Sequence, residues 1–266
     1  MQNVKICCLY SGSKGNSTFI SAGGAKILID AGKSAKALCS ALASIGESID
    51  DIDAIFITHE HNDHISALQV LSHRHRIPIH MLLNSAQIFN GLCDEKLCEC
   101  LRLYRGNGFA ATVRGLRVIA FETSHDSRAA VGYRLEFEDE SGESVAVAVS
   151  TDTGYVTDTM RENILGCHAV VIESNHDLGM LMDGPYPYEL KKRISSKRGH
   201  LSNADCAAFA AELYESGTHH IMLAHLSEEN NLADLAFSET FTAIADEGFD
   251  LKVARQDEPV WLIGEH

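Results

Sequence analysis

The chain has 266 residues, of which 45% are hydrophobic, and its 22 basic and 37 acidic side chains give a formal net charge of −15. This much apolar material predicts one large core, so we expect a single domain over residues 1–266; the negative charge argues against broad, nonspecific binding to nucleic acid. The chain has no apolar run long enough for a membrane span and no signal-peptide pattern at Met1–Lys5, so we expect a cytoplasmic protein with no membrane partner.

Short apolar patterns typical of strands alternate with amphipathic patterns typical of helices. Strands are expected at Val4–Tyr10, Thr18–Ser21, Ala25–Ile29, Ala54–Thr58, Ile79–Leu83, Leu116–Glu122, Val131–Glu138, Val145–Ser150, Ala169–Glu173, His220–Ala224, Leu251–Ala254 and Val260–Ile263. Helices are expected at Ser34–Ile45, Ile65–His75, Ser85–Leu92, Pro187–Ser195, Ser202–Ser216 and Leu232–Asp246. The alternation predicts an α/β fold in which helices cover two sheets. A TIM barrel is the competing arrangement, but the closely spaced early strands argue against it.

Side chains able to bind a metal follow several of these strands. The segment Thr58–His64, which reads Thr-His-Glu-His-Asn-Asp-His, places three imidazoles and a carboxylate directly after an apolar strand. Residues two apart share a face of an extended segment, so His59 and His61 can bind one ion, while Asp63 and His64 can bind a second. Zinc, manganese and iron all accept imidazole and carboxylate ligands. The segment therefore predicts a metal site, and a solvated His-rich turn is the alternative.

The pattern His-x-His-x-Asp-His in this segment resembles the signature of the metallo-β-lactamase superfamily. That family also has polar residues after later strands, and this chain fills those positions in order with Asp30, His125, Asp152 and His225. The resemblance implies an αββα four-layer sandwich with a dinuclear metal site at the edge of its two sheets. It implies two divalent ions, zinc or manganese with iron also allowed. His59, His61 and His125 would hold the first ion and Asp63, His64 and His225 the second; Asp152 would bridge them and Asp30 would orient a ligand histidine.

Two further segments concern the substrate. The Gly-rich turn Ser11–Ser17 could offer donors to an oxyanion through Ser13 and Asn16, or it could be a plain β-turn. A strand that ends in Glu173, together with Gly-His-Leu-Ser at 199–202, resembles the arrangement of tRNA 3′-processing ribonucleases. That resemblance implies that His200 protonates the leaving oxygen and that Glu173 orients His200.

Several neighbouring residues have more than one interpretation. Ser202 fits a helix N-cap as well as a substrate contact, and His176 could contact phosphate, join the metal ligands or cap a turn. A basic run just before His200 could be a solvated face, but its position favours contact with phosphate; it consists of Lys191, Lys192, Arg193, Lys197 and Arg198. The spacing of Cys93, Cys98 and Cys100 permits metal binding, oxidation or an incidental role.

The segments taken together, including Tyr-Pro-x-x-Leu-Lys-x-Arg-Ile at 186–194, resemble the YycJ/WalJ group of compact bacterial proteins regarded as DNA exonucleases. We therefore expect a metal-dependent phosphodiesterase that acts on DNA rather than RNA as an exonuclease. A metal-bridging hydroxide would attack phosphorus, with His200, Glu173 and Asp63 as catalytic residues. A small-molecule hydrolase of the same fold, acting on a cyclic phosphodiester, thioester or lactone, is the alternative, and a scaffold with a vestigial site is a third hypothesis. Metal identity, polarity of digestion, strand preference, the choice between DNA, RNA and a small phosphodiester, and homodimer formation stay open.

Overall fold

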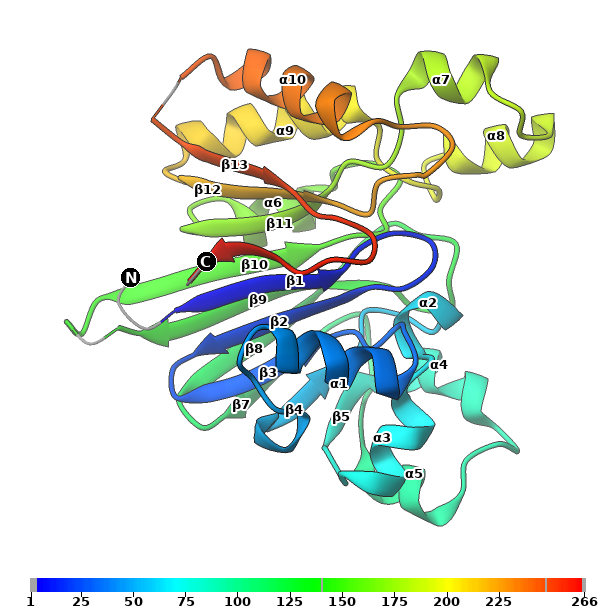
Figure 1. Cartoon of the computed structure of the whole chain (residues 1–266), viewed down its shortest axis with the longest axis vertical. Helices are drawn as coiled ribbons and strands as arrows, with labels where there is room; N and C mark the ends of the chain where they lie inside the picture. The colour runs from blue at the N-terminus through cyan, green and yellow to red at the C-terminus, as the bar shows by residue number, and fades with distance from the viewer. Residues whose placement is uncertain (1–3, 140, 247, 265–266) are drawn as a thin grey trace.

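Two sheets lie face to face in the computed structural model, which describes residues 4–139, 141–246 and 248–264 (Figure 1). The first sheet has the order β14 (Val260–Ile263), β1 (Lys5–Tyr10), β2 (Ser17–Ala22), β3 (Ala25–Ile29), β4 (Ala54–Phe56), β5 (Ile79–Leu82), β6 (Leu101–Tyr104). The second has the order β13 (Asp250–Val253), β12 (His220–Ala224), β11 (Ala169–Glu173), β10 (Ser144–Ser150), β9 (Val131–Glu138), β8 (Leu116–Glu122), β7 (Phe109–Val113).

Helices cover the outer face of each sheet. The first sheet packs against α1 (Ala35–Ser44), α2 (Asn62–Ile65), α3 (Leu68–Arg74), α4 (Leu83–Ala86) and α5 (Glu95–Cys100). The second packs against α6 (Asp158–Ile164), α9 (Asn203–Glu215) and α10 (Ala233–Ile244). Two short helices, α7 (Leu178–Asp183) and α8 (Tyr188–Ile194), form a hairpin that extends beyond the end of the second sheet (Figure 1). The arrangement is the expected four-layer α/β sandwich.

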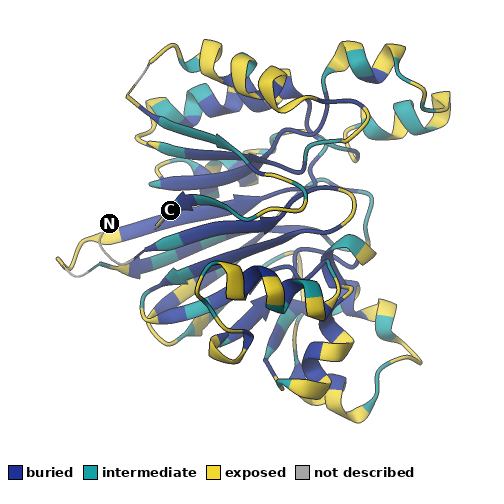
Figure 2. Ribbon diagram, viewed as in Figure 1, coloured by how far each residue is buried: buried dark blue, intermediate teal, exposed yellow. Residues whose placement is uncertain are grey.

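The core is divided among the spaces between these layers. Alternate residues of β1 show this division, because Ile6 and Cys8 pack between the two sheets, whereas Cys7 and Leu9 pack beneath the helices of the first sheet. The two adjacent cysteines therefore face opposite sides of the sheet, as successive residues of a strand do. Figure 2 shows the consequence, with buried strands in the middle and exposed residues on the outer faces of the helices. Two rigid sheets held this way fix the positions of their strand ends.

The predicted elements agree with the structure except in the middle of the chain. The helix expected over Ile65–His75 is divided, because α2 ends at Ile65 and α3 begins at Leu68. The single helix expected over Ser85–Leu92 is wrong, since α4 ends at Ala86 and a 3₁₀ turn spans Gln87–Phe89. Strands β6 and β7 and helices α5, α6 and α7 were not expected; their half-exposed or short sequences give little periodic signal.

The cysteine group lies in α5 and just before it, away from the ends of the central strands. Cys93 and Cys98 form a disulfide, which matches the oxidation alternative, and Cys100 is buried against the outer face of the first sheet. Among the helices that the structure describes, none combines the length and apolar character needed to cross a membrane.

Candidate metal centre

The candidate ligands meet at one edge of the sandwich because they follow strands whose carboxyl ends lie together. β3 and β4 are parallel neighbours in the first sheet, as are β10, β11 and β12 in the second. Asp30 and His225 directly follow β3 and β12, and Asp152 lies two residues after the end of β10. All three have left-handed backbone angles, with φ of 63° for Asp30, 58° for Asp152 and 57° for His225. Such a conformation costs a non-glycine residue about 1–3 kcal/mol, and strain of this kind is concentrated at functional sites. The turns direct these three side chains into the same space.

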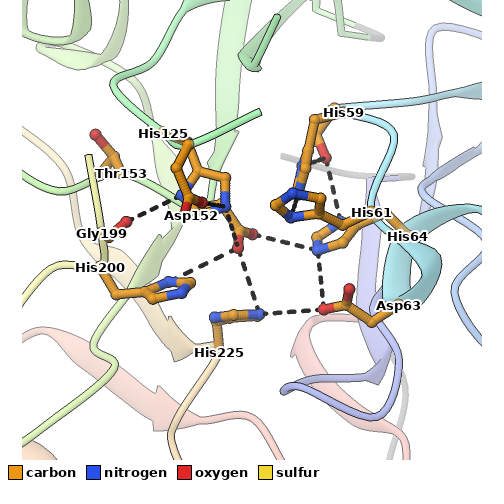
Figure 3. Close-up of polar contacts among 12 residues, drawn as sticks. His59, His61, Asp63, His64, His125, Asp152, Thr153, Gly199, His200 and His225 are labelled. Atoms are coloured by element: carbon orange, nitrogen blue, oxygen red, sulfur yellow. Dashed lines mark hydrogen bonds and ion pairs between the residues drawn. The ribbon is translucent and has the colours of Figure 1, made fainter. Parts of the chain in front are cut away.

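The first group of ligands consists of His59, His61 and His125, whose ligand atoms lie within 4.8 Å of one another (Figure 3). His59 Nε2 is 2.9 Å from His61 Nδ1. His125 Nδ1 donates a hydrogen bond of 3.0 Å to the carbonyl oxygen of Gly199, so the other ring nitrogen, Nε2, is directed into the group. Burial lowers the pKa of both His59 and His125. Both imidazoles are therefore favoured in the neutral form that binds a metal.

The second group consists of Asp63, His64 and His225. Asp63 Oδ2 is 3.4 Å from His64 Nε2 and 3.7 Å from His225 Nε2. On the far side of the His64 ring, Nδ1 lies 2.8 Å from Asp30 Oδ2, and Asp30 also accepts hydrogen bonds of 2.8 Å from the backbone N–H and hydroxyl of Thr58. Asp30 thus has the contact expected of a carboxylate that orients a ligand histidine.

Asp152 lies between the two groups and is 2% exposed. Its Oδ2 is 3.4 Å from His64 Nε2, and its Oδ1 is 3.5 Å from His225 Nε2 and 3.8 Å from His125 Nε2. Burial opposes ionisation, but the charges of His225 and His64 outweigh it and hold the pKa of Asp152 well below its usual range. Asp152 therefore lies between the two groups of candidate ligands, where a carboxylate that bridges two ions would have to lie.

The spacing and the unpaired atoms both fit metal ions. Two ligand atoms about 2.1 Å from one tetrahedral ion lie about 3.4 Å apart, which is close to the separations around Asp152. Within the described part of the chain, the buried atoms Asp152 Oδ2 and His225 Nε2 have no hydrogen-bond partner. Buried polar atoms without partners are costly, and bound cations would satisfy these two. The donor set of imidazoles and carboxylates suits zinc, manganese or iron.

Asn16, expected to contact substrate, lies beneath the second group and is 6% exposed. Its Nδ2 donates to Asp63 Oδ2 at 3.2 Å and to Gly12 O at 3.1 Å, while its Oδ1 accepts from Gly12 N at 2.9 Å. The Gly-rich turn is therefore tied directly to a candidate ligand. Gly32 lies against the same segment, and a Cβ there would be 1.5 Å from Asp63 O. No local pattern in the sequence indicates that Asn16 positions Asp63.

Glu173 and His200 form the pair that the sequence predicts. His200 Nδ1 is 2.7 Å from Glu173 Oε1, and the same oxygen is 3.0 Å from His225 Nδ1. Glu173 Oε2 accepts from the backbone N–H groups of Thr153 at 2.8 Å and Leu201 at 3.2 Å. Burial opposes ionisation of Glu173, but the charge of His200 and its hydrogen bond lower the pKa of Glu173 to about 2. One buried carboxylate thus orients both the candidate acid and a candidate ligand, and its contact with His225 was not expected.

The basic run is partly engaged within the chain. Arg193 pairs with Asp126, which follows His125 in sequence. Arg198 donates to the carbonyl oxygen of His125 at 3.1 and 3.2 Å. Lys191 donates to a backbone carbonyl of α7, and Lys197 lies over the ring of Tyr155; Lys192 is exposed. Two of the five basic residues therefore support the loop that carries His125.

The remaining candidates have different surroundings. Ser202 Oγ accepts from Asp205 N at 3.1 Å, so its N-cap interpretation is confirmed. The His176 ring is 1% exposed, has no hydrogen-bond partner among the described residues and lies outside the ligand groups. Ser13 is exposed and lines a cavity of about 180 Å³ next to His200 and His225. A larger cavity, of about 400 Å³, lies beside His125.

Comparison with known proteins agrees with this geometry. A family model described as a beta-lactamase superfamily domain matches residues 25–226. Among solved structures, the metallo-β-lactamase fold protein YhfI from Bacillus subtilis superposes with a TM-score of 0.69 at 16% identity, covering 98% of this chain and 100% of YhfI. The fold and the His/Asp cluster are thus those of a metal-dependent hydrolase.

Two curated relatives indicate the group within the superfamily to which the chain belongs. The chain is 34% identical to exodeoxyribonuclease YycJ of Bacillus anthracis, over 91% of this chain and 89% of the relative. It is 36% identical to exodeoxyribonuclease WalJ of Streptococcus pneumoniae (serotype 2, strain D39), over 94% of this chain and 93% of the relative. The chain belongs to the metallo-β-lactamase superfamily and, within it, to the group that contains YycJ and WalJ.

Proposed function

We propose that the protein is a metal-dependent phosphodiesterase that removes nucleotides from DNA ends. The observation that carries this proposal is the His200–Glu173 pair, held 2.7 Å apart and next to the bridging carboxylate of Asp152. A departing sugar oxygen is a poor leaving group until it is protonated. A proton donor at this position therefore suits the cleavage of a DNA phosphodiester. Both relatives are named exodeoxyribonucleases, which supports DNA as the substrate.

In this proposal the two groups of ligands hold two divalent ions. His59, His61 and His125 would bind the first and Asp63, His64 and His225 the second, with Asp152 next to residues of both groups. When bound, such ions offset the charge of phosphate oxygens and make water nucleophilic at neutral pH. Asp30 and Asn16 hold His64 and Asp63 in place through the hydrogen bonds described above.

The hydrogen bonds of His200 indicate which of its two ring nitrogens carries the proton that can be transferred. Its Nδ1–H is held by Glu173, so the proton that can be transferred lies on Nε2. As a hydroxide, formed when water releases a proton to the solvent, bonds through its oxygen to phosphorus, the bond from phosphorus to the leaving sugar oxygen breaks, and Nε2 gives its proton to that oxygen. The His200 side chain is 21% exposed, whereas Glu173 is fully buried. Substrate can thus reach the His200 ring, whereas solvent does not reach the carboxylate of Glu173.

Binding of the DNA strand must be local, because the net charge of the chain is −15. Lys192 and Lys197 are exposed on the segment before His200, where they can contact phosphates. Arg193 and Arg198 contribute less directly, through the loop that carries His125. A DNA substrate also accords with the expected cytoplasmic location.

The experiment that tests this function is digestion of single- and double-stranded DNA and RNA, labelled at either end, by purified protein with Mn²⁺ or Zn²⁺. We expect progressive release of nucleotides from DNA, abolished by a chelator and strongly reduced in His200→Ala. No cleavage of any nucleic acid by protein whose metal content is verified would refute the proposal. That result would favour a small phosphodiester as substrate.

A further inference from the structure

The cavity of about 180 Å³ beside His200 has a wall that the proposed chemistry does not use. Tyr186, Leu190, Arg193 and Ile194 line the cavity, and they all come from the Tyr-Pro-x-x-Leu-Lys-x-Arg-Ile segment that leads into and forms α8. Leu190, Arg193 and Ile194 are three or four residues apart and share one face of α8, while Tyr186 lies two residues before the helix begins. Tyr186, Leu190 and Ile194 are only partly buried. Apart from Arg193, this part of the lining is thus apolar, and it is incompletely packed.

The same cavity is lined by candidate catalytic and metal-binding residues. His200 and His225 line it, with Gly199 and Leu226 beside them. Asn175 and Ser227 add polar groups, and Arg193 lies at the same cavity as its partner Asp126. An apolar pocket with an aromatic ring and a few polar groups is the usual form of a site for a flat heterocyclic ligand. Because the pocket lies next to His200, a ligand bound in it would belong to the leaving group that His200 protonates.

The larger cavity, which His125 lines, differs in its chemical character. Its lining is mostly polar and includes Thr123, Ser124, Arg128, Thr157 and Arg198. A surface of hydroxyls and guanidinium groups suits a sugar-phosphate backbone rather than a base. The two cavities therefore offer different surroundings: the polar one is lined by His125, and the more apolar one by His200 and His225.

We propose that the cavity beneath α8 binds the nucleobase of the nucleoside whose oxygen leaves, with the ring of Tyr186 stacked on the base and Leu190 and Ile194 supporting its edge. This inference rests on the proposed nuclease function and adds a specificity-determining site to it. His200 must lie within hydrogen-bonding distance of the departing oxygen, so the nucleoside that carries this oxygen lies next to the cavity that His200 lines. Stacking on an aromatic ring would accept any of the four bases.

The test compares DNA oligonucleotides that carry one abasic residue, at the terminal or the penultimate position, with the intact sequence. The product that ends in a free hydroxyl at the cut identifies the leaving side. Loss of the base on that side should lower kcat/KM of the unmodified protein about tenfold, whereas loss of the base on the other side should have a much smaller effect.

Variants supply the matched controls. Tyr186→Ala should lower kcat/KM on intact DNA about tenfold and should no longer distinguish the leaving-side abasic substrate, while Tyr186→Phe, which keeps the ring, should restore both properties. Tyr188→Ala is the control, because Tyr188 is 72% exposed and does not line the cavity. Metal content and melting temperature verify that each variant is folded and loaded.

Three results would count against the pocket. The unmodified protein could cleave both abasic substrates as fast as intact DNA, Tyr186→Ala could be as active as the unmodified protein, or Tyr188→Ala could lose as much as Tyr186→Ala. Each would refute the pocket and leave the nuclease function standing, because DNA would still be digested. Absence of digestion of every substrate by loaded protein would instead overturn the nuclease function itself, and the pocket with it.

Discussion

Replacement of Glu173 by glutamine tests the carboxylate that connects the proton donor to the metal ligands. Glu173 accepts four hydrogen bonds: Oε1 from the rings of His200 and His225, and Oε2 from the N–H groups of Thr153 and Leu201. Glutamine has one acceptor oxygen and one NH₂ group. Either orientation of its amide therefore directs the NH₂ at two donors and removes two of the four hydrogen bonds.

The size of the effect follows from these contacts. A hydrogen bond to a charged group contributes about 1.5–3 kcal/mol, so loss of two lowers the free energy of unfolding by roughly 3–6 kcal/mol before relaxation. If the amide turns its NH₂ towards the histidines, His200 loses the acceptor that holds its Nδ1–H. We therefore expect turnover on DNA to fall by about 10²–10⁴.

Denaturant unfolding, elemental analysis and initial rates on DNA measure these effects on one preparation. Glu212→Gln is the matched control, because Glu212 is 41% exposed and pairs with Arg161 at the surface; its loss should change the free energy of unfolding by less than about 1 kcal/mol. Turnover of Glu173→Gln within threefold of the unmodified protein, with both metals retained, would refute the positioning role of Glu173.

Three further changes test other parts of the structure. Asp152→Ala should lose metal and activity together, as measured by elemental analysis and DNA digestion, because Asp152 contacts ligands of both groups. Gly32→Ala should destabilise the fold by several kcal/mol in denaturant unfolding and weaken metal binding, since its Cβ would overlap Asp63 O at 1.5 Å. In metal-free protein, acid should destabilise the native state through His80, because burial lowers the pKa of His80 to about 4. In the unfolded chain His80 takes up a proton below about pH 6.5, whereas in the folded chain it does so only near pH 4. Its contribution to the free energy of unfolding is therefore present at pH 7 and is lost as the pH falls from about 6.5 towards 4. This loss is at most about 3 kcal/mol, and about half that after solvent screening.

Each of these changes has a control or an outcome that contradicts it. Asp158→Ala alters an exposed aspartate and should keep metal and activity; full metal retention by Asp152→Ala would contradict a bridging role. Gly46→Ala has open space and a positive φ of 77°, so it should cost only about 1 kcal/mol of backbone strain, and an equal cost at Gly32 would contradict the overlap. His80→Gln should remove part of the acid sensitivity, and an unchanged pH dependence of unfolding would contradict the argument.

Most of the candidate ligands could be named from the sequence, and the structure brings them together. Four lie within the six residues from His59 to His64, where their spacing alone predicts a metal site. The others, His125, Asp152 and His225, were expected from the resemblance to the metallo-β-lactamase superfamily. The same reasoning could not find the hydrogen bond from Asn16 to Asp63, which joins residues 47 apart, or that between Glu173 and His225, which are 52 apart. Such contacts depend on how the two sheets pack, and no local spacing records them.

The elements that were missed also have a physical explanation. Strand β6, Leu101–Tyr104, has no fully buried residue, and in β7 half-exposed residues alternate with exposed ones. The alternation of apolar and polar residues is therefore weak in both strands. Helices α5, α6 and α7 span six or seven residues, too few for a helical period to repeat twice. Their side-chain N-caps, Asp94, Thr157 and Asp177, were the available signals.

The most direct test of the account is the dependence of the His200 effect on the leaving group. Rates of the unmodified protein and of His200→Ala are compared on DNA and on thymidine 5′-(p-nitrophenyl phosphate), whose nitrophenolate leaves without protonation. Because His200 donates a proton to the leaving oxygen, we predict a loss of about 10²–10⁴ on DNA and a loss of only a few-fold on the nitrophenyl ester, with metal content unchanged. Equal losses on both substrates, or no loss on DNA, would contradict His200 as the proton donor.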